Sequence, residues 1–234
     1  MQGQINIGSV TGDLIYDLCK ISDIINIVEI GTWNGQGSTY CIYKSIIDST
    51  KTDYKVISVE VDLAYYNKAK ALYNAFNISN FFLLYGRVVE ISDVQTNLNI
   101  IDDKFFKEYP RVQQKVWLDQ DIINMTKADN VVNLLPSTID LLILDGGEFS
   151  TYADFSTLKN RTKIFILDDS EKIKGFKIKQ EIESTPREFP IILNAPTVRN
   201  GVLLFTNSKL LPQKVTDRIK NILIKKKYDS VNNK

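Results

Sequence analysis

Residues Val28 to Thr39, VEIGTWNGQGST, carry the clearest fold signal in the chain. It joins a short apolar run to three glycines and then to a helix-like segment, which is the pattern of a strand, a tight turn and a helix start. In an open α/β sheet, the turn after the first strand brings backbone close to a ligand. The glycine spacing is GxxxGxG, whereas a turn that seats a dinucleotide pyrophosphate has GxGxxG. The stretch therefore indicates a turn for a ligand without phosphates, with an ordinary tight crossover as the alternative.

Apolar runs recur along the chain, and longer helix-like segments separate them. The predicted strands are 26–30, 54–60, 81–85, 139–144 and 163–167, and predicted helices cover 38–47 and 64–76. Continuous rather than alternating apolar runs are typical of strands buried on both faces of a parallel sheet. Strands that alternate with helices indicate βαβ units. We therefore predict an α/β fold with a Rossmann-like, doubly wound, mostly parallel sheet.

Two regions interrupt this alternation. Residues 86–137 are too many for one crossover, and we predict a helical insertion of two or three helices there. Near the C-terminus, apolar runs at 190–193 and 202–205 flank an Asn-Gly pair, which is a strong hairpin signal. The sheet is therefore expected to finish with an antiparallel strand. A helix over 215–224, with a basic end, is predicted within a C-terminal segment of 208–234.

Composition excludes several classes of protein. The chain of 234 residues has 29 Lys and Arg against 28 Asp and Glu, a formal net charge of +1. This balance argues against a protein that coats nucleic acid or an anionic membrane. There is no histidine, so a Ser-His-Asp or Cys-His nucleophile and an HExxH zinc site are excluded. The length suits a single domain, residues 1–234.

The cysteines and the first residues bear on the cell compartment. Cys19 and Cys41 have no CxxC spacing, and we expect two reduced, buried side chains, as in a cytosolic protein. The first ten residues, MQGQINIGSV, contain neither the basic nor the apolar part of a signal peptide. No apolar run approaches the ~20 residues of a membrane span. We therefore expect a cytoplasmic protein without a membrane partner.

A carboxylate ends the second predicted strand. Glu60 is placed to accept two hydrogen bonds from ribose hydroxyls, and the nearby Asp62 is better placed as the N-cap of the next helix. A solvated surface glutamate is the alternative. Together with the glycine turn, Glu60 favours a site for a nucleoside.

These residues resemble the class I S-adenosylmethionine-dependent methyltransferases. VEIGTWNGQGST is similar to the first motif of that family, and ISVEVD at 57–62 is similar to its acidic second-strand motif. The resemblance implies S-adenosyl-L-methionine as the cofactor, with Glu60 on its ribose. It also implies five residues around the methionine part: Glu29, Gly31, Gly35, Gly37 and Ser38. The loop is one residue longer than the usual EIGxxxGxS, so either of the last two meets the methionine carboxylate.

Three aspartates follow two of the predicted strands. Asp145 follows the fourth strand, and Asp168 and Asp169 follow the fifth. Adjacent parallel strands end at the same edge, where these carboxylates would repel each other unless a cation neutralises them. Oxygen ligands suit Mg²⁺, Mn²⁺ or Ca²⁺. We therefore predict a divalent metal site, with helix N-caps as the alternative role.

The same aspartates resemble the metal triad of cation-dependent small-molecule and sugar O-methyltransferases. That resemblance implies Mg or Mn held by Asp145, Asp168 and Asp169, which polarises the hydroxyl to be methylated. LDGGEFSTYADF at 144–155 is similar to the DGxHxYxxxxxD segment of the sugar-modifying branch, with Glu148 in the place of its histidine. Glu148 is therefore the candidate general base, or a further metal ligand, and it shares the catalytic role with Asp145.

Five other side chains near this edge have two interpretations each. Tyr152 and Asp154 are expected to be structural. Lys172 and Lys174 are expected to be solvated, with contact to an anionic substrate group as the alternative. Arg199 lies at the final hairpin, where it either contacts substrate or stays on the surface.

We interpret the chain as an O-methyltransferase that acts on a hydroxyl of a sugar, a glycan or another small molecule. The insertion is expected to be part lid and part substrate wall, with Tyr109 and Trp117 either packed among helices or stacked on a substrate ring. The alternatives are a catalytically inactive methyltransferase-fold binding protein and a nicotinamide-dependent oxidoreductase. The near-neutral net charge argues against the hypothesis that the chain methylates RNA, so no nucleic-acid partner is expected. A homodimer is a further expectation.

Overall fold

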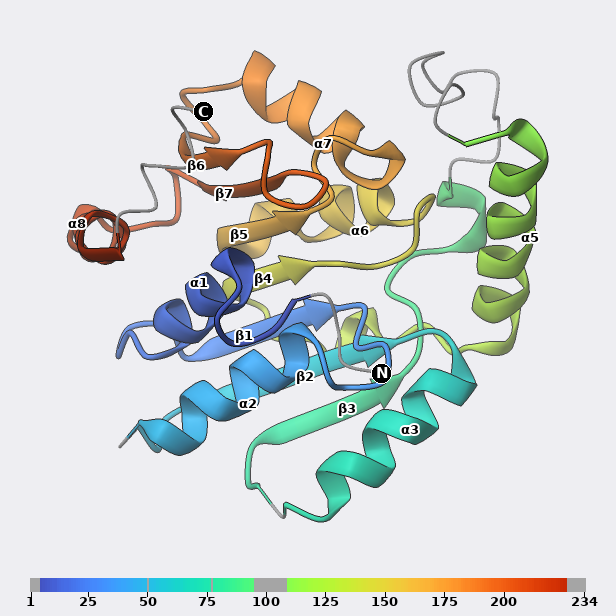
Figure 1. Ribbon diagram of the computed structural model, residues 1–234, viewed down its shortest axis with the longest axis horizontal. Helices are drawn as coiled ribbons and strands as arrows, with labels where there is room; N and C mark the ends of the chain where they lie inside the picture. Colours follow the sequence, from blue (N-terminus) through green and yellow to red (C-terminus); the bar gives the residue numbers. More distant parts are fainter. Residues whose placement is uncertain (1–4, 50, 77, 95–108, 227–234) are drawn as a thin grey trace.

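A single seven-stranded sheet carries the site. The structure is a computed structural model, and it describes residues 5–49, 51–76, 78–94 and 109–226 (Figure 1). The strand order is β3-β2-β1-β4-β5-β7-β6. The strands are β1 (Asn26–Ile30), β2 (Lys55–Glu60), β3 (Phe81–Tyr85), β4 (Ile139–Leu144), β5 (Thr162–Asp168), β6 (Ile191–Ala195) and β7 (Val202–Thr206). The five strands predicted to be parallel are confirmed to within one residue at each end.

The C-terminal hairpin closes the sheet as expected. β7 is antiparallel to β5 and also to β6, which confirms the predicted antiparallel strand. β6 lies outside β7 at the edge, so β7 is the strand that meets the parallel part of the sheet. The pairing places Asp168 opposite Val202, and this register brings the hairpin turn to the carboxyl end of β5.

Helices cover both faces of the sheet, so the predicted doubly wound architecture is confirmed. Buried side chains alternate along the strands between two clusters, one packed under α1, α2 and α8 and the other under α5, α6 and α7. The helices are α1 (Val10–Cys19), α2 (Ser38–Asp48), α3 (Leu63–Asn74), α5 (Arg111–Lys127), α6 (Thr151–Leu158), α7 (Ile173–Ser184) and α8 (Gln213–Lys226). The described residues also form the short 3-10 helices η1 (Ile91–Asp93), η3 (Val132–Leu134) and η4 (Lys159–Arg161). Over the described ranges, no helix is long and apolar enough to cross a membrane.

The described part of the expected insertion contains one long helix, α5. Within 86–137 the structure describes 86–94 and 109–137, where α5 stands beside the carboxyl ends of the parallel strands (Figure 1). The predicted second or third helix falls partly on 95–108, which lies outside the described residues. The last of the three C-terminal lysines, Lys227, also lies outside them.

Candidate functional site

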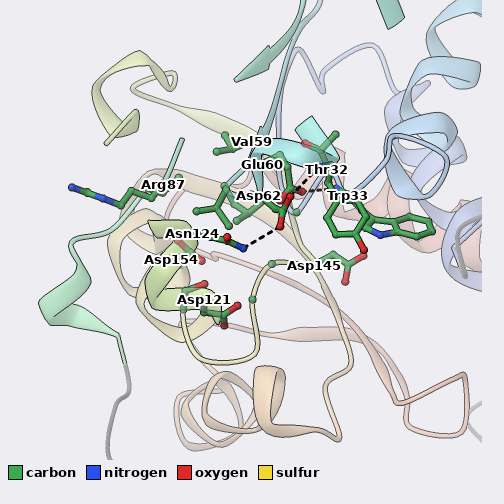
Figure 2. Close-up of a pocket in the computed structure, with 18 of the residues that line it drawn as sticks. Thr32, Trp33, Val59, Glu60, Asp62, Arg87, Asp121, Asn124, Asp145 and Asp154 are labelled. Carbon is green, nitrogen blue, oxygen red and sulfur yellow. Dashed lines mark hydrogen bonds between the residues drawn. The ribbon is translucent and has the colours of Figure 1, made fainter. Parts of the chain in front are cut away.

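A cavity of about 540 Å³ opens where β1, β2 and β4 end. That volume is in the range of small-molecule and cofactor sites, which run from about 300 to 1,000 Å³. Its wall includes the glycine turn after β1, the end of β2, the segment after β4 and one side of α5 (Figure 2). Among the residues that line the cavity are Gly31, Thr32, Trp33, Gly37, Ser38, Glu60, Asp62, Asp121, Asn124, Asp145, Asp154, Lys174 and Arg199.

The glycine turn is shaped by close approach to β4. Gly31 has φ +98°, and a Cβ on it would lie 2.1 Å from the backbone oxygen of Asp145. Gly35 has φ +81° and packs against α3, where its carbonyl accepts a 2.6 Å hydrogen bond from the Tyr73 hydroxyl. Gly31 and Gly37 line the cavity, whereas Gly35 is absent from its described wall. Gly31 and Gly35 are therefore needed for the path of the turn, and Gly37 leaves room beside a ligand.

Helix α2 begins at the cavity wall. It starts at Ser38, its N-cap is Gly37, and the cap makes no side-chain hydrogen bond. Backbone N–H groups in the first turn of a helix, together with the helix dipole, favour an anionic ligand. Both residues line the cavity, and their contact with the methionine carboxylate, which the resemblance implies, stays a prediction.

Glu29 lies beneath the turn, away from the cavity wall. The side chain is fully buried, and its Oε2 accepts hydrogen bonds from the Thr39 and Ser58 hydroxyls. Burial raises the pKa of Glu29 to about 7, an effect that these hydroxyls partly offset. Because the described cavity wall does not include Glu29, its contacts hold the turn against β2 and α2 and do not reach the ligand space.

Glu60 is fixed at the end of β2 by two backbone groups. Its Oε2 accepts a 2.6 Å hydrogen bond from the Trp33 N–H, and its Oε1 accepts one of 2.8 Å from the Asp62 N–H (Figure 2). The residue is 7% exposed and lines the cavity, and burial raises its pKa to about 7. Each carboxylate oxygen has a second lone pair, so Glu60 can still accept from ligand hydroxyls. Asp62 caps α3 through the N–H groups of Ala64 and Tyr65, as predicted.

The three predicted aspartates meet. Asp145, Asp168 and Asp169 each offer a carboxylate oxygen within 4.8 Å of the others, and together they could bind a cation. Asp168 is fully buried, and neither of its carboxylate oxygens accepts a hydrogen bond in the described structure. A buried carboxylate needs positive charge beside it, and although Arg199 lies 3.0 Å from one Asp168 oxygen, the three converging carboxylates also fit a metal ion.

The alternative role of these aspartates as helix caps is wrong. Helix α6 has Ser150 as its N-cap, and α7 has Lys172, and neither position is one of the aspartates. Asp169 has φ +55°, a left-handed conformation that costs of order 1–2 kcal/mol in a residue with a side chain. The backbone is therefore held in a costly form next to the acidic cluster.

Two basic side chains reach the cluster. The Lys174 Nζ lies 2.6 Å from Asp145 Oδ1 and 2.9 Å from Asp169 Oδ2. Arg199 Nη2 lies 3.0 Å from Asp168 Oδ2. The expectation that Lys174 is solvated is wrong, because its side chain is 4% exposed and paired with two acids. The sequence shows a lysine near the strand end but not which way helix α7 turns it.

Glu148 lies beside this cluster. It is partly buried, and its pKa is raised mainly by burial, while the nearby Lys174 lowers it. The described cavity wall does not include Glu148. Its role as general base stays a prediction.

A second acidic pair lines the cavity, and neither of its members is predicted from the sequence as a site residue. Asp121 on α5 and Asp154 on α6 both face the cavity (Figure 2). Burial raises the pKa of Asp121 to about 6 and that of Asp154 to about 7. Asp154 was expected to be structural. The mixed apolar spacing around Asp121 gave no signal for the face of α5 on which it lies.

The remaining predicted side chains pack within the protein. Trp117 is packed against the α5–α7 face of the core and makes an edge contact with Tyr109, with ring centroids 4.9 Å apart. The Tyr152 hydroxyl donates a 2.9 Å hydrogen bond to Glu181. These contacts favour packing for Trp117 and a structural role for Tyr152.

Comparison with solved structures identifies the fold. The chain is similar to an O-methyltransferase from Bacillus cereus in complex with SAH (15% identity, TM-score 0.55, 88% of this chain and 84% of that chain). It is also similar to a putative caffeoyl-CoA O-methyltransferase from Staphylococcus aureus (13% identity, TM-score 0.52, 85% of this chain and 83% of that chain). A third similar structure is TomG from Streptomyces achromogenes, an O-methyltransferase involved in tomaymycin synthesis, in complex with SAM (13% identity, TM-score 0.52, 84% of this chain and 78% of that chain). No family model and no curated protein matches the chain.

These likenesses, together with the strand order, show that the chain has the class I S-adenosylmethionine-dependent methyltransferase fold. At such low identities they establish the fold and leave the reaction to be argued from the site.

Proposed function

We propose that this protein is an S-adenosylmethionine-dependent O-methyltransferase that acts on a hydroxyl group of a small molecule. The observation that carries the proposal is the buried Glu60 carboxylate, which is aimed into the cavity beside the glycine turn. A carboxylate at this strand end accepts hydrogen bonds from the two ribose hydroxyls of a nucleoside.

The cavity suits a cationic cofactor. Glu60, Asp121, Asp145 and Asp154 all line it. In their ionised form these acids attract a positive sulfonium and repel a pyrophosphate, although Arg87, Lys174 and Arg199 line the same cavity. This argues against the nicotinamide-dependent alternative, as does the GxxxGxG spacing of the turn. S-adenosylmethionine supplies an electrophilic methyl group that passes to the acceptor oxygen as its bond to sulfur breaks, leaving S-adenosylhomocysteine.

The chain's own residues would position these groups. Glu60 holds the ribose, and the start of α2 at Gly37 and Ser38 holds the methionine carboxylate. Glu29, for which the resemblance implies a place beside the methionine part, supports the turn through Thr39 instead.

We further propose that Asp145, Asp168 and Asp169 hold a Mg or Mn ion. The support is the three converging oxygens and the buried carboxylate of Asp168, whose oxygens accept no hydrogen bond in the described structure although Arg199 lies 3.0 Å from one of them. Such an ion, when bound, lowers the pKa of an acceptor hydroxyl. Glu148, whose pKa burial raises, is our candidate to take the released proton.

For the acceptor, we propose a sugar or glycan hydroxyl first and another small-molecule hydroxyl second. The proposal of a sugar acceptor rests on the resemblance of DGGEFSTY to the sugar-modifying branch. The proposal of a small-molecule acceptor in general is supported by the fold shared with the putative caffeoyl-CoA O-methyltransferase and with TomG. We also propose a cytoplasmic protein, supported by its two buried free cysteines, and a homodimer, supported by the exposed Val112, Val116 and Ile123 on α5.

Calorimetry tests the core of the proposal. S-adenosylhomocysteine should bind and NAD should not. Binding of NAD in place of S-adenosylhomocysteine would overturn it. An inactive binding protein would bind S-adenosylhomocysteine but transfer no labelled methyl group to any member of a screen of sugars, nucleotide sugars and phenols.

A further inference from the structure

We propose that the ammonium group of Lys174 and a divalent cation compete for the same place in the acidic cluster, so that Lys174 sets how tightly the site binds metal. This inference rests on the cation site of the proposed function. It concerns a side chain that neither the resemblance nor the fold assigns to that site.

The ammonium is bonded to the oxygens that a metal would need. The Lys174 Nζ lies 2.6 Å from Oδ1 of Asp145 and 2.9 Å from Oδ2 of Asp169. The other oxygen of Asp169 accepts a 2.8 Å hydrogen bond from the Asn200 side chain. A metal that binds Asp169 would therefore share an oxygen with either Lys174 or Asn200, and on the oxygen that Lys174 contacts it would lie beside the ammonium group.

The two cations are too close to stay together. A Mg or Mn ion binds carboxylate oxygens at about 2.1 Å, so an ion on that Asp145 oxygen would lie less than about 5 Å from the ammonium. Repulsion between a double and a single positive charge at this separation, in a site sheltered from water, is several times thermal energy. The side chain of Lys174 is 4% exposed, so water screens the repulsion only weakly.

Lysine satisfies only part of the cluster. Asp168 is fully buried, and neither of its oxygens accepts a hydrogen bond within the described structure, although Arg199 Nη2 is 3.0 Å from one of them. The lysine ammonium group has three N–H donors at the end of one side chain, whereas a metal ion coordinates oxygen ligands from all directions. The arrangement is therefore that of a site in which lysine holds two of the three carboxylates until a metal takes all three.

The position of Lys174 in its helix is explained by these acids. It is the second residue of α7, in the first turn, where the helix dipole disfavours a positive charge. The basic group is thus unfavourable for the helix itself, and its two ion pairs with the cluster offset that cost.

The test is a titration of the 234-residue chain with Mn²⁺ alone, in which electron paramagnetic resonance measures the free ion at each step. Lys174→Met replaces lysine by an unbranched side chain one atom shorter and removes the charge. We expect it to bind Mn²⁺ roughly tenfold or more tightly than the unmutated protein. Lys179→Met is the matched control, because Lys179 lies on the same helix and pairs with Glu171 instead. It should leave the affinity within about twofold. Equal or weaker binding by Lys174→Met would overturn the proposal.

A second variant identifies the site that is measured. Adding Asp168→Asn to Lys174→Met should abolish the tight binding. If tight binding survives, the ion sits elsewhere and the proposal fails. Should Lys174→Met not fold, Lys174→Gln takes its place with the same expectations, and absence of Mn²⁺ binding in every folded variant also overturns it.

The unmutated protein gives an independent measurement. A buried ammonium held by two carboxylates has a distinct ¹⁵N signal, and Mg²⁺ should move it toward the signals of exposed lysines. An unchanged signal in a sample that calorimetry shows to be loaded with Mg²⁺ would contradict the proposal. Neither measurement uses a methyl donor, so the result is separate from the S-adenosylhomocysteine titration that tests the proposed function.

Discussion

The backbone N–H of Trp33 donates a 2.6 Å hydrogen bond to Oε2 of Glu60, and this bond joins the glycine turn to the end of the second strand. Trp33 has φ +50°, a conformation that costs of order 1–2 kcal/mol in a residue with a side chain. The bond to a buried carboxylate offsets part of that cost. The Glu60 side chain therefore stabilises the conformation of the turn and also lines the cavity.

Glu60→Gln should weaken the binding of S-adenosylhomocysteine by roughly 10- to 100-fold. The amide retains one acceptor oxygen but turns an NH₂ group toward either a backbone N–H or the ribose hydroxyls. Calorimetry measures the Kd. Glu183→Gln, a change of the same kind on an exposed part of α7, is the control and should bind normally. Unchanged affinity in Glu60→Gln would remove Glu60 from the cofactor site.

Two glycines of the turn should respond differently to alanine. A Cβ on Gly31 would lie 2.1 Å from the Asp145 backbone oxygen, whereas the nearest atom to one on Gly37 is 3.8 Å away. Gly31→Ala should lower the free energy of unfolding by about 3 kcal/mol or more, and Gly37→Ala by less than about 1 kcal/mol. Urea denaturation measures both. Similar losses in the two variants would show that the close approach to Asp145 does not control the turn.

The strands and most of the predicted site follow from local sequence. Strands buried on both faces need continuous apolar runs, and those runs gave the bounds of the five parallel strands. Once the strands are placed, Glu60, Asp145 and Asp168 must lie at their ends, because parallel strands finish at one edge. The convergence of the three aspartates was therefore predictable without coordinates.

The basic partners of the cluster were not predictable in the same way. Arg199 meets Asp168 because β7 pairs with β5 in the register that sets Asp168 opposite Val202, and sequence does not reveal a register. The position of Lys174 depends on α7 beginning at Ile173, without a capping side chain to mark its start. Both contacts join residues that are far apart in the sequence and come together only when the chain folds.

The unliganded protein should lose stability as the pH rises. Burial raises the pKa of Glu29 and Glu60 from 4.5 to about 7, and that of Asp154 from 3.8 to about 7. The folded state thus binds more protons than the unfolded state, and the stabilisation present at low pH is lost as the pH rises through about 7. Urea denaturation at about pH 5.5 and about pH 8.5 measures the change in the free energy of unfolding. Glu29→Gln should flatten the dependence and Glu183→Gln should leave it unchanged. A protein that becomes more stable across this range would contradict the buried state of these groups.

Asp168→Asn should abolish stabilisation of the protein by Mn²⁺. Asp168 is the fully buried member of the cluster, and its carboxylate oxygens accept no hydrogen bond in the described structure. An ion that binds only the folded state raises its stability by about 2.7 kcal/mol at a concentration one hundred times its Kd. Thermal unfolding with and without Mn²⁺ should therefore show a rise in Tm for the unmutated protein and none for Asp168→Asn. The control is Asp119→Asn, which alters an exposed acid paired with Lys115 on α5 and should retain the rise. An equal rise in Asp168→Asn would place the ion outside the cluster, and the three aspartates would then owe their convergence to Lys174 and Arg199 alone.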